Sequence, residues 1–207
     1  MDLTIIVGTF GDQKWSDLAK GRAVPSAESE DVRVIHNHGE VLESYGASLA
    51  ACRNDAARKA TTEFLLFLDA DDEIEPGFVK AMGETNGDLR TPAVRYIRPG
   101  RGAARPMFWP EKNIQDSNYL IVSTLIRREL FWEVGGFEPF DLYEDWCLFS
   151  RCIKAGATVT RVPDAICRVH IDPQSKHRYG SSRAEKLAAH HAVRSAVWPE
   201  LNLEEAA

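Results

Sequence analysis

The sequence predicts an α/β fold with a mixed, mostly parallel sheet and helices on both of its faces. Short apolar segments rich in β-branched residues alternate with segments whose apolar residues recur at helical spacing, and this alternation is typical of a parallel α/β sheet. A length of 207 residues is enough for one domain with a substantial core. The composition, 44% hydrophobic and 27% charged, is that of a soluble globular protein.

The first half of the chain contains three expected strand–helix units. The strands are short, apolar and β-branched, as in a buried parallel sheet, and we expect them at residues 3–9, 32–38 and 63–69. The helices follow an apolar pattern at helical spacing, with Pro76 suited to a first turn, and we expect them at 12–20, at 44–60 and from 75 onward.

The second half is less regular. Residues 88–100 favour a strand pair that ends in a loop rich in proline and glycine, and residues 119–137 favour a strand and a short helix stopped by two glycines. A helix over 144–156, two short strands over 157–163 and 165–171, and a tail helix over 183–197 complete the pattern. We find no repeat and no linker, so we expect one domain over residues 1–207.

Bulk properties exclude several classes of protein. The net charge of −6 and the pI near 5.6 argue against a surface that binds nucleic acid as a whole. No apolar run approaches the length of a membrane span, about 20 residues, and the N-terminus lacks the basic region of a signal peptide. The four scattered cysteines favour small core residues kept reduced, so we expect a cytoplasmic protein without an integral membrane segment.

The stretch FLLFLDADDEIEPGF ends an apolar strand in Asp69, Asp71 and Asp72. Ligands of an open α/β sheet bind beyond the carboxyl ends of its strands, and carboxylates this close together repel one another unless a cation lies between them. Oxygen ligands suit Mg²⁺ or Mn²⁺, and Mg²⁺ commonly joins such carboxylates to a substrate phosphate. A solvated acidic loop is the alternative. A calcium loop of the EF-hand type is excluded, because Ile74 stands where that loop needs glycine.

Four segments in this order resemble the GT-A glycosyltransferases of the family 2 type, which are inverting enzymes that use a nucleotide-diphospho-sugar. The resemblance covers about residues 3–170. Its segments are LTIIVGTF, GASLAACRNDAARKATTEFLLFLDADDEIEPGFV, LIRRELFWEVGGFEPF and YEDWCLFSRCIKAG. It implies a GT-A fold, with a donor-binding half over about 1–95, an acceptor-binding half over about 96–180 and a helical tail over 181–207.

The resemblance also implies roles for the acidic residues. Asp69 would lie near the ribose of the donor, Asp71 would bind the Mn²⁺ or Mg²⁺ that bridges the diphosphate, and Asp72 would assist it. Many relatives place a further metal ligand at the position of His170, although a lone histidine is more often structural. Asp145 would be the general base, and its place at a helix start should keep it ionised; the alternative is that it only favours the helix N-terminus.

Further positions are implied to contact the donor. Thr9 ends the strand that runs under the nucleotide, Arg53 lies near the phosphates, and Gly136 belongs to a turn close to the transferred sugar. Arg178 lies in a polar segment, residues 174–183, that is either a loop closing over the diphosphate or an ordinary surface loop.

The second expected strand departs from the family pattern. An aspartate pair that reads the base is replaced by His36, Asn37 and His38. Asn37 can still hydrogen-bond a base edge, but the class of nucleotide is left open. The two histidines lack a second pair of ligands for zinc. The adjacent residues His190 and His191 are expected at the surface of the tail helix.

The acceptor stays undefined, as a glycan, a protein, a lipid-linked molecule or a modified nucleic acid, and so does the oligomeric state. The arginines between Arg90 and Arg105, with Tyr96, Phe108 and Trp109, form either a positive, partly aromatic acceptor surface or a solvated loop. Two other functions compete with glycosyl transfer. One is a non-catalytic module that binds a nucleotide sugar or a partner, and the other is a sugar-phosphate nucleotidyltransferase, for which the first loop offers only one basic residue, Lys14.

Overall fold

The computed structural model describes residues 1–39, 48–171 and 181–201. The strands of its sheet lie in the order β2-β1-β3-β6-β5-β7-β4. β1 is parallel to β2 and β3, and β5 is parallel to β7, whereas β6 and β4 are antiparallel to their neighbours. The bounds are β1 Leu3–Phe10, β2 Arg33–Gly39, β3 Phe64–Phe67, β4 Glu73–Ile74, β5 Leu89–Ile97, β6 Leu125–Arg127 and β7 Val159–His170.

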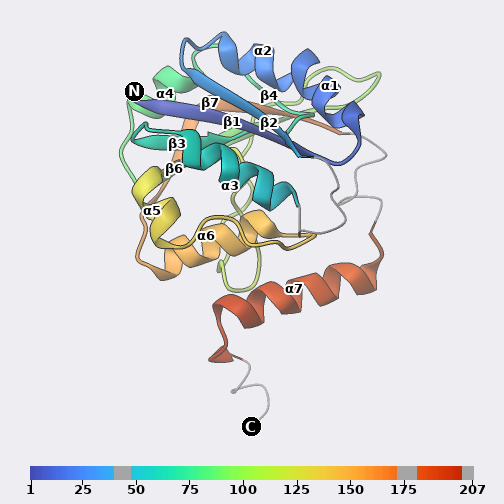
Figure 1. Cartoon of the computed structure of the whole chain (residues 1–207), viewed down its shortest axis with the longest axis vertical. Coiled ribbons are helices and arrows are strands. Elements are labelled where there is room, and N and C mark those ends of the chain that lie inside the picture. The colour runs from blue at the N-terminus through green and yellow to red at the C-terminus, as the bar shows by residue number, and fades with distance from the viewer. Residues whose placement is uncertain (40–47, 172–180, 202–207) are drawn as a thin grey trace.

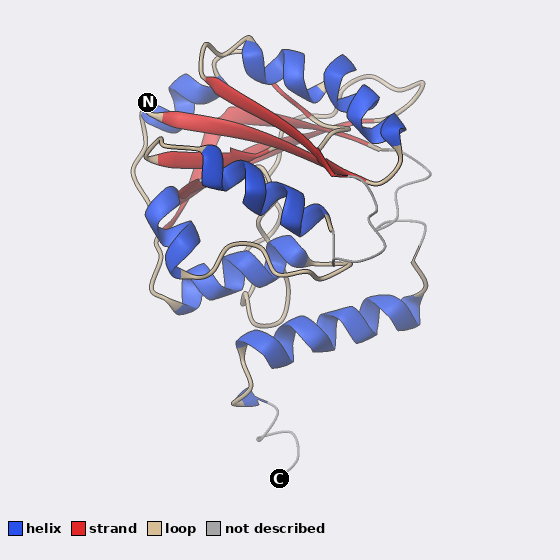
Figure 2. Cartoon of the chain, viewed as in Figure 1, coloured by secondary structure: helices blue, strands red, loops and turns tan. Residues whose placement is uncertain are grey.

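Helices cover both faces of the sheet, as Figures 1 and 2 show. The bounds are α1 Gln13–Gly21, α2 Ala23–Glu28, α3 Leu49–Lys59, α4 Phe78–Gly83, α5 Arg128–Glu133, α6 Glu144–Lys154 and α7 Arg183–Val197. One core cluster joins the sheet to α1, α2 and α4, and a second joins the opposite face to α3, α5 and α6. The expected α/β class, with a mixed sheet between two layers of helices, is therefore confirmed.

Helix α7 lies outside these layers and packs against α6. Val193 and Val197 of α7 share a third cluster with Trp146 and Cys147 of α6. Ser182 starts α7 with a capping box, in which its side chain and that of Glu185 each accept a backbone N–H of the other. This packing places α7 beside the cleft described below.

Three local predictions were wrong. Residues 157–171 contain one strand, β7, instead of two, because β7 pairs with β5 on both sides of an irregularity opposite Pro92 and Ala93. Residues 88–100 contain the single strand β5 instead of a strand pair. Pro76 precedes α4, which begins at Phe78 after Gly77 in a left-handed conformation (φ 85°). The sequence pattern also missed α2 and the two-residue strand β4.

Candidate active site

A cleft of about 570 Å³ opens where the acidic turn, residues Asp69 to Asp72, faces the start of α6. The turn follows β3, whose four residues are all buried, so the apolar strand carries the carboxylates to the end of the sheet. The cleft is lined by these carboxylates and by residues from α6, β7, α7 and the segment before β6, among them Trp109, Asn118, Asp145, His170 and His190.

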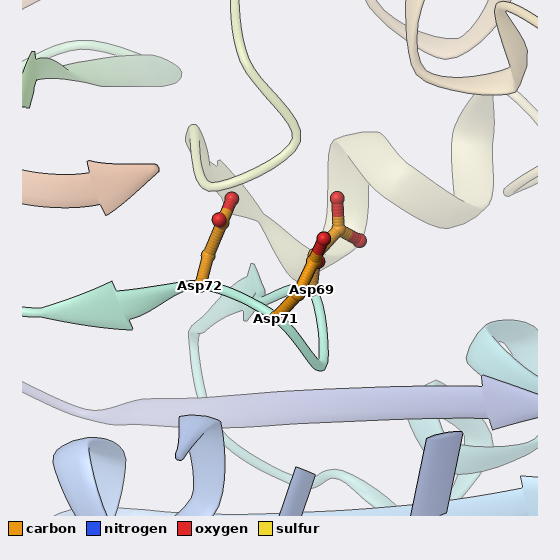
Figure 3. Close-up of side chains that lie close together, drawn as sticks. All are labelled: Asp69, Asp71 and Asp72. Carbon is orange, nitrogen blue, oxygen red and sulfur yellow. The ribbon is translucent and has the colours of Figure 1, made fainter. Parts of the chain in front are cut away.

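The acidic turn gathers three carboxylates. One oxygen from each of Asp69, Asp71 and Asp72 lies within 4.8 Å of the others, and Figure 3 shows the side chains leaving the turn on the same side. Asp72 is 7% exposed, and burial, followed by the charges of Asp71 and Asp69, raises its pKa well above the ordinary value. A cation at this turn would relieve the repulsion, and an all-oxygen donor set fits Mg²⁺ or Mn²⁺.

His170 lines the cleft, but its ring contacts Glu73 and not the acidic turn. Its backbone N–H donates to Asp72 Oδ1 over 3.0 Å, while its ring Nε2 donates to Glu73 Oε2 over 2.6 Å. Its ring is not part of the group of ligand atoms formed by the acidic turn. The expected role as a metal ligand therefore stays a prediction, and it requires the ring to exchange Glu73 for the metal.

Arg53 of α3 joins the acidic turn to α6 beneath the cleft. Its guanidinium donates to Asp69 Oδ1 over 2.5 Å and to Glu144 Oε1 over 2.8 Å, and it lies 5.0 Å from the centre of the Phe137 ring. The side chain is only 2% exposed. Burial alone would lower the pKa of Arg53, but the charges of Asp69 and Glu144 raise it above the ordinary value. A side chain at Gly8 would meet the Arg53 stem, since a Cβ there would lie 2.8 Å from Arg53 Cγ.

The pairing of Arg53 has a consequence for its expected role. Two of its guanidinium nitrogens already contact carboxylates, and the residue does not line the cleft. The structure therefore shows a residue that holds two walls of the cleft together. Contact with donor phosphates stays a prediction.

Asp145 stands at the start of α6 with both oxygens engaged. Oδ1 accepts the backbone N–H of Trp146 over 2.7 Å, and Oδ2 accepts the side-chain amide of Asn118 over 3.0 Å. Burial, followed by the charge of Glu144, raises the pKa of Asp145 to about 7. Burial and the neighbouring carboxylate therefore act against the ionised form that the helix start was expected to favour.

The sequence pattern missed Asn118 and the contacts that hold its loop. The indole of Trp146 donates to the carbonyl of Ile114 over 2.6 Å, and His190 Nε2 donates to the carbonyl of Asp116 over 2.8 Å. The rings of His190 and Trp146 lie 4.7 Å apart. His190 is therefore packed into the wall of the cleft and not a free surface residue. The irregular segment before β6 carries no periodic signal that could have identified it.

Thr9 and Asn37 lie at the ends of neighbouring strands, away from the lining of the cleft. Thr9 Oγ1 lies 3.0 Å from His38 Nδ1 and 3.3 Å from His36 Nε2. Asn37 donates its side-chain amide to the carbonyl of Cys52 over 2.9 Å. Among the described residues, neither histidine belongs to a group of three metal-ligating side chains.

Two other expected donor contacts lie elsewhere. Gly136 follows α5 with φ 72°, and its carbonyl accepts a hydrogen bond from Arg151. It packs against Phe131 and Asn54 and does not line the cleft. Arg178 lies outside the described residues. The donor roles of Thr9, Asn37, Gly136 and Arg178 stay predictions.

The arginines between 90 and 105 fall into two groups. Arg90 is buried and donates to the carbonyl of Met82 over 2.8 Å, and Arg95 forms an ion pair with Glu75 over 2.7 Å. These two residues stabilise the fold and were wrongly included in the expected surface. Arg98, Arg101 and Arg105 are exposed.

No helix within the described ranges is long and apolar enough to cross a membrane.

The model of one protein family, described as glycosyl transferase family 2, matches residues 22–140. No curated protein matches the chain. Solved structures match a larger part of the chain. Residues 1–349 of S. aureus TarS are 18% identical with a TM-score of 0.61, and the match covers 82% of this chain and 60% of that one.

Two further structures are similar. The structure of TarS 1–349 in complex with UDP-GlcNAc is 18% identical to this chain in sequence, with a TM-score of 0.66. The match covers 88% of this chain and 61% of that one. The structure of GalNAc-T7 with UDP, GalNAc and Mn²⁺ is 15% identical to this chain in sequence, with a TM-score of 0.58. That match covers 96% of this chain and 48% of GalNAc-T7. The chain thus spans about 60% of the TarS 1–349 structures that it matches.

Proposed function

The chain belongs to glycosyl transferase family 2, and we propose that it moves a sugar from a nucleotide-diphospho-sugar to an acceptor hydroxyl, with inversion and a divalent metal. One observation carries the proposal: the acidic turn and Asp145 line the same cleft, and Arg53 joins their two walls. A metal and donor site would thereby face a candidate general base.

The donor lies on the side of the acidic turn in this proposal. Asp71 and Asp72 would hold Mn²⁺ or Mg²⁺, Asp69 would lie near the ribose, and His170 would be a further ligand. A bound divalent metal neutralises negative charge that develops on the departing nucleoside diphosphate. The raised pKa of Asp72 supports this role, because a carboxyl that is costly to ionise alone becomes an anionic ligand beside a cation.

The chemical step needs a proton acceptor on the opposite side. The acceptor oxygen attacks the anomeric carbon as the bond from that carbon to the diphosphate oxygen breaks, and the leaving diphosphate keeps the electron pair. Asp145 takes the proton of the acceptor hydroxyl on a carboxylate oxygen. A pKa near 7 suits this role, since general bases work best when their pKa lies near the working pH.

The donor base and the acceptor are not defined by these residues. TarS and GalNAc-T7 have been crystallised with UDP or a UDP-sugar, so uridine donors are the first to test, with Thr9, Asn37, Arg53, Gly136 and Arg178 as proposed contacts. The division into a donor-binding half over about 1–95, an acceptor-binding half over about 96–180 and a tail is part of the same proposal. The acceptor would be a glycan, a protein, a lipid-linked molecule or a modified nucleic acid.

A thermal-shift panel of UDP-, GDP-, CDP- and dTDP-sugars, each with and without Mn²⁺, tests the donor site. A donor at a hundred times its Kd adds about 2.7 kcal/mol, which corresponds to a rise in Tm of about 5 to 10 °C at this chain length. We expect such a rise with one donor class and only with the metal. Asp71→Asn should abolish it, while the control Asp17→Asn, on exposed α1, should keep it.

Two results would contradict the donor site. One is an equal rise without metal, and the other is an equal rise in Asp71→Asn. Release of nucleoside diphosphate from a donor that binds would then separate an enzyme from a non-catalytic binding module.

A further inference from the structure

The chain leaves the end of β5 in a loop that carries the exposed arginines, and we call residues 97–107 the arginine hairpin. Its base is closed by paired backbone hydrogen bonds between Val94 and Met107, of 2.7 and 2.9 Å. The N–H of Ala104 donates to the carbonyl of Tyr96 over 3.3 Å, and Arg95 donates to the carbonyl of Ala104 over 3.1 Å. These bonds fix the direction in which the loop leaves the sheet.

The arginine hairpin is positively charged on an acidic protein. No Asp or Glu occurs between residues 95 and 110, although the chain has a net charge of −6. Arg98, Arg101 and Arg105 are all exposed, and in the described part of the chain none of them forms an ion pair. Their charges are therefore available to an anionic partner.

The arginine hairpin continues directly into the rim of the cleft. Ile97 is paired with His170, which lines the cleft, and its carbonyl accepts the N–H of Ile171 over 2.9 Å. Strand spacing and one further residue place the Arg98 backbone within about 9 Å of the His170 backbone. Trp109 also lines the cleft and donates its indole N–H to Tyr96 Oη over 2.7 Å. An aromatic pair thus lies between the arginines and the cleft.

We infer that the arginine hairpin binds the acceptor, and that the acceptor is an anionic polysaccharide. The inference rests on the proposed function. Guanidinium groups bind the carboxylate, phosphate or sulfate groups of such a chain in a bidentate manner, and Trp109 offers an apolar face to a sugar ring beside the reacting hydroxyl. The arginines lie outside the cleft and the acidic turn lies inside it, where it would repel an anion. An acceptor bound by both regions would therefore be a chain that extends out of the cleft.

Nucleic acid and membrane fit this surface less well. A DNA duplex carries a charge about every 1.7 Å of its axis, and an acidic protein would repel it around the small basic loop. The exposed large hydrophobic side chain in the hairpin is Met107, at 46%, which is little to insert into a bilayer. The binding of nucleic acid and of membrane is nevertheless measured separately in the test.

The test measures the Kd of a fluorescent oligogalacturonate by anisotropy at low ionic strength, with neutral dextran as the uncharged comparison. The variant Arg98→Gln/Arg101→Gln/Arg105→Gln removes the three charges. The matched control Lys20→Gln/Arg58→Gln/Lys80→Gln removes three exposed charges from α1, α3 and α4. Exposed ion pairs are individually weak, so we expect the hairpin variant to bind about tenfold more weakly and the control to bind as the wild type does.

Three results would overturn the inference. They are an unchanged Kd in the hairpin variant, equal weakening in the control, and tighter hairpin-dependent binding of a DNA duplex or of phosphatidylserine vesicles. The proposed function can fail separately. If the hairpin-dependent binding of polysaccharide is present but no donor binds, the inferred binding surface is supported and the proposed enzyme activity is contradicted.

Discussion

Arg53 is predicted to be the most costly single side chain to remove from the site. In Arg53→Met, two carboxylates lose the buried guanidinium that contacts them at 2.5 and 2.8 Å. Breaking one partner of a buried ion pair costs about 3 to 5 kcal/mol. Asp69 is 38% exposed, and water can therefore solvate part of the charge that is left. We accordingly expect the lower end, a loss of about 3 kcal/mol in the free energy of unfolding.

The loss should depend on pH. Arg53 lowers the pKa of Asp69 and of Asp145, so its removal raises both pKa values in the folded protein further above those of the unfolded chain. Such carboxyls bind more protons when folded, and stability then falls as pH rises. Urea unfolding followed by tryptophan fluorescence, with EDTA present, should show a smaller loss at pH 5 than at pH 8.

A matched variant isolates the charges. Arg53→Met/Asp69→Asn/Glu144→Gln removes the whole network, and replacement of all partners commonly costs little, so it should recover at least half of the loss at pH 8. A loss below about 1 kcal/mol in Arg53→Met, the value of an exposed pair, or the same loss at both pH values, would refute this account of Arg53.

Three further predictions concern the proposed base, the side chain that donates to it, and the glycine turn after α5. Donor turnover should rise with pH through about 7, because Asp145 accepts a proton only when ionised and its pKa lies near that value; a pH profile of kcat that is flat from pH 5 to 8 would contradict this. Asn118→Ala removes a hydrogen bond that favours the ionised form of Asp145, so kcat should fall and the acid limb should move to higher pH, whereas a merely structural role would leave the limb in place. Gly136→Ala should lower the free energy of unfolding by about 2 kcal/mol, because φ is 72° and the new Cβ would lie 2.8 Å from Asn54 Oδ1. In the control Gly21→Ala the new Cβ meets no neighbouring group within 4 Å, so calorimetry should show no loss of stability.

Elements with a strong local signal were predictable. The bounds of α7 agree with the expected 183–197, because a capping box marks its start and Pro199 follows its end. The acidic turn also follows β3 as expected, since an apolar strand and the polar residues after it are adjacent in sequence. Such features depend on neighbours within a few positions.

Features that depend on distant residues were not predictable. Arg53 and Glu144 are 91 positions apart, and no spacing in the sequence shows that they meet. The junction within β7 looks like a break, because Pro163 and Asp164 interrupt the apolar pattern. Pairing with β5 on both sides makes it one strand. The raised pKa of Asp145 likewise depends on burial by the folded chain and on the charge of Glu144, which outweigh the hydrogen bond from the backbone N–H of Trp146.

The central claim is that Asp145 and the acidic turn act together on a nucleotide-sugar. The most direct measurement is release of nucleoside diphosphate from the donor that binds, with Mn²⁺, by the wild type, Asp145→Asn and Asp71→Asn. We predict turnover by the wild type, a loss of about a hundredfold or more in kcat for Asp145→Asn with donor affinity retained, and weakened metal-dependent donor binding for Asp71→Asn. Near-normal turnover by Asp145→Asn would contradict the account.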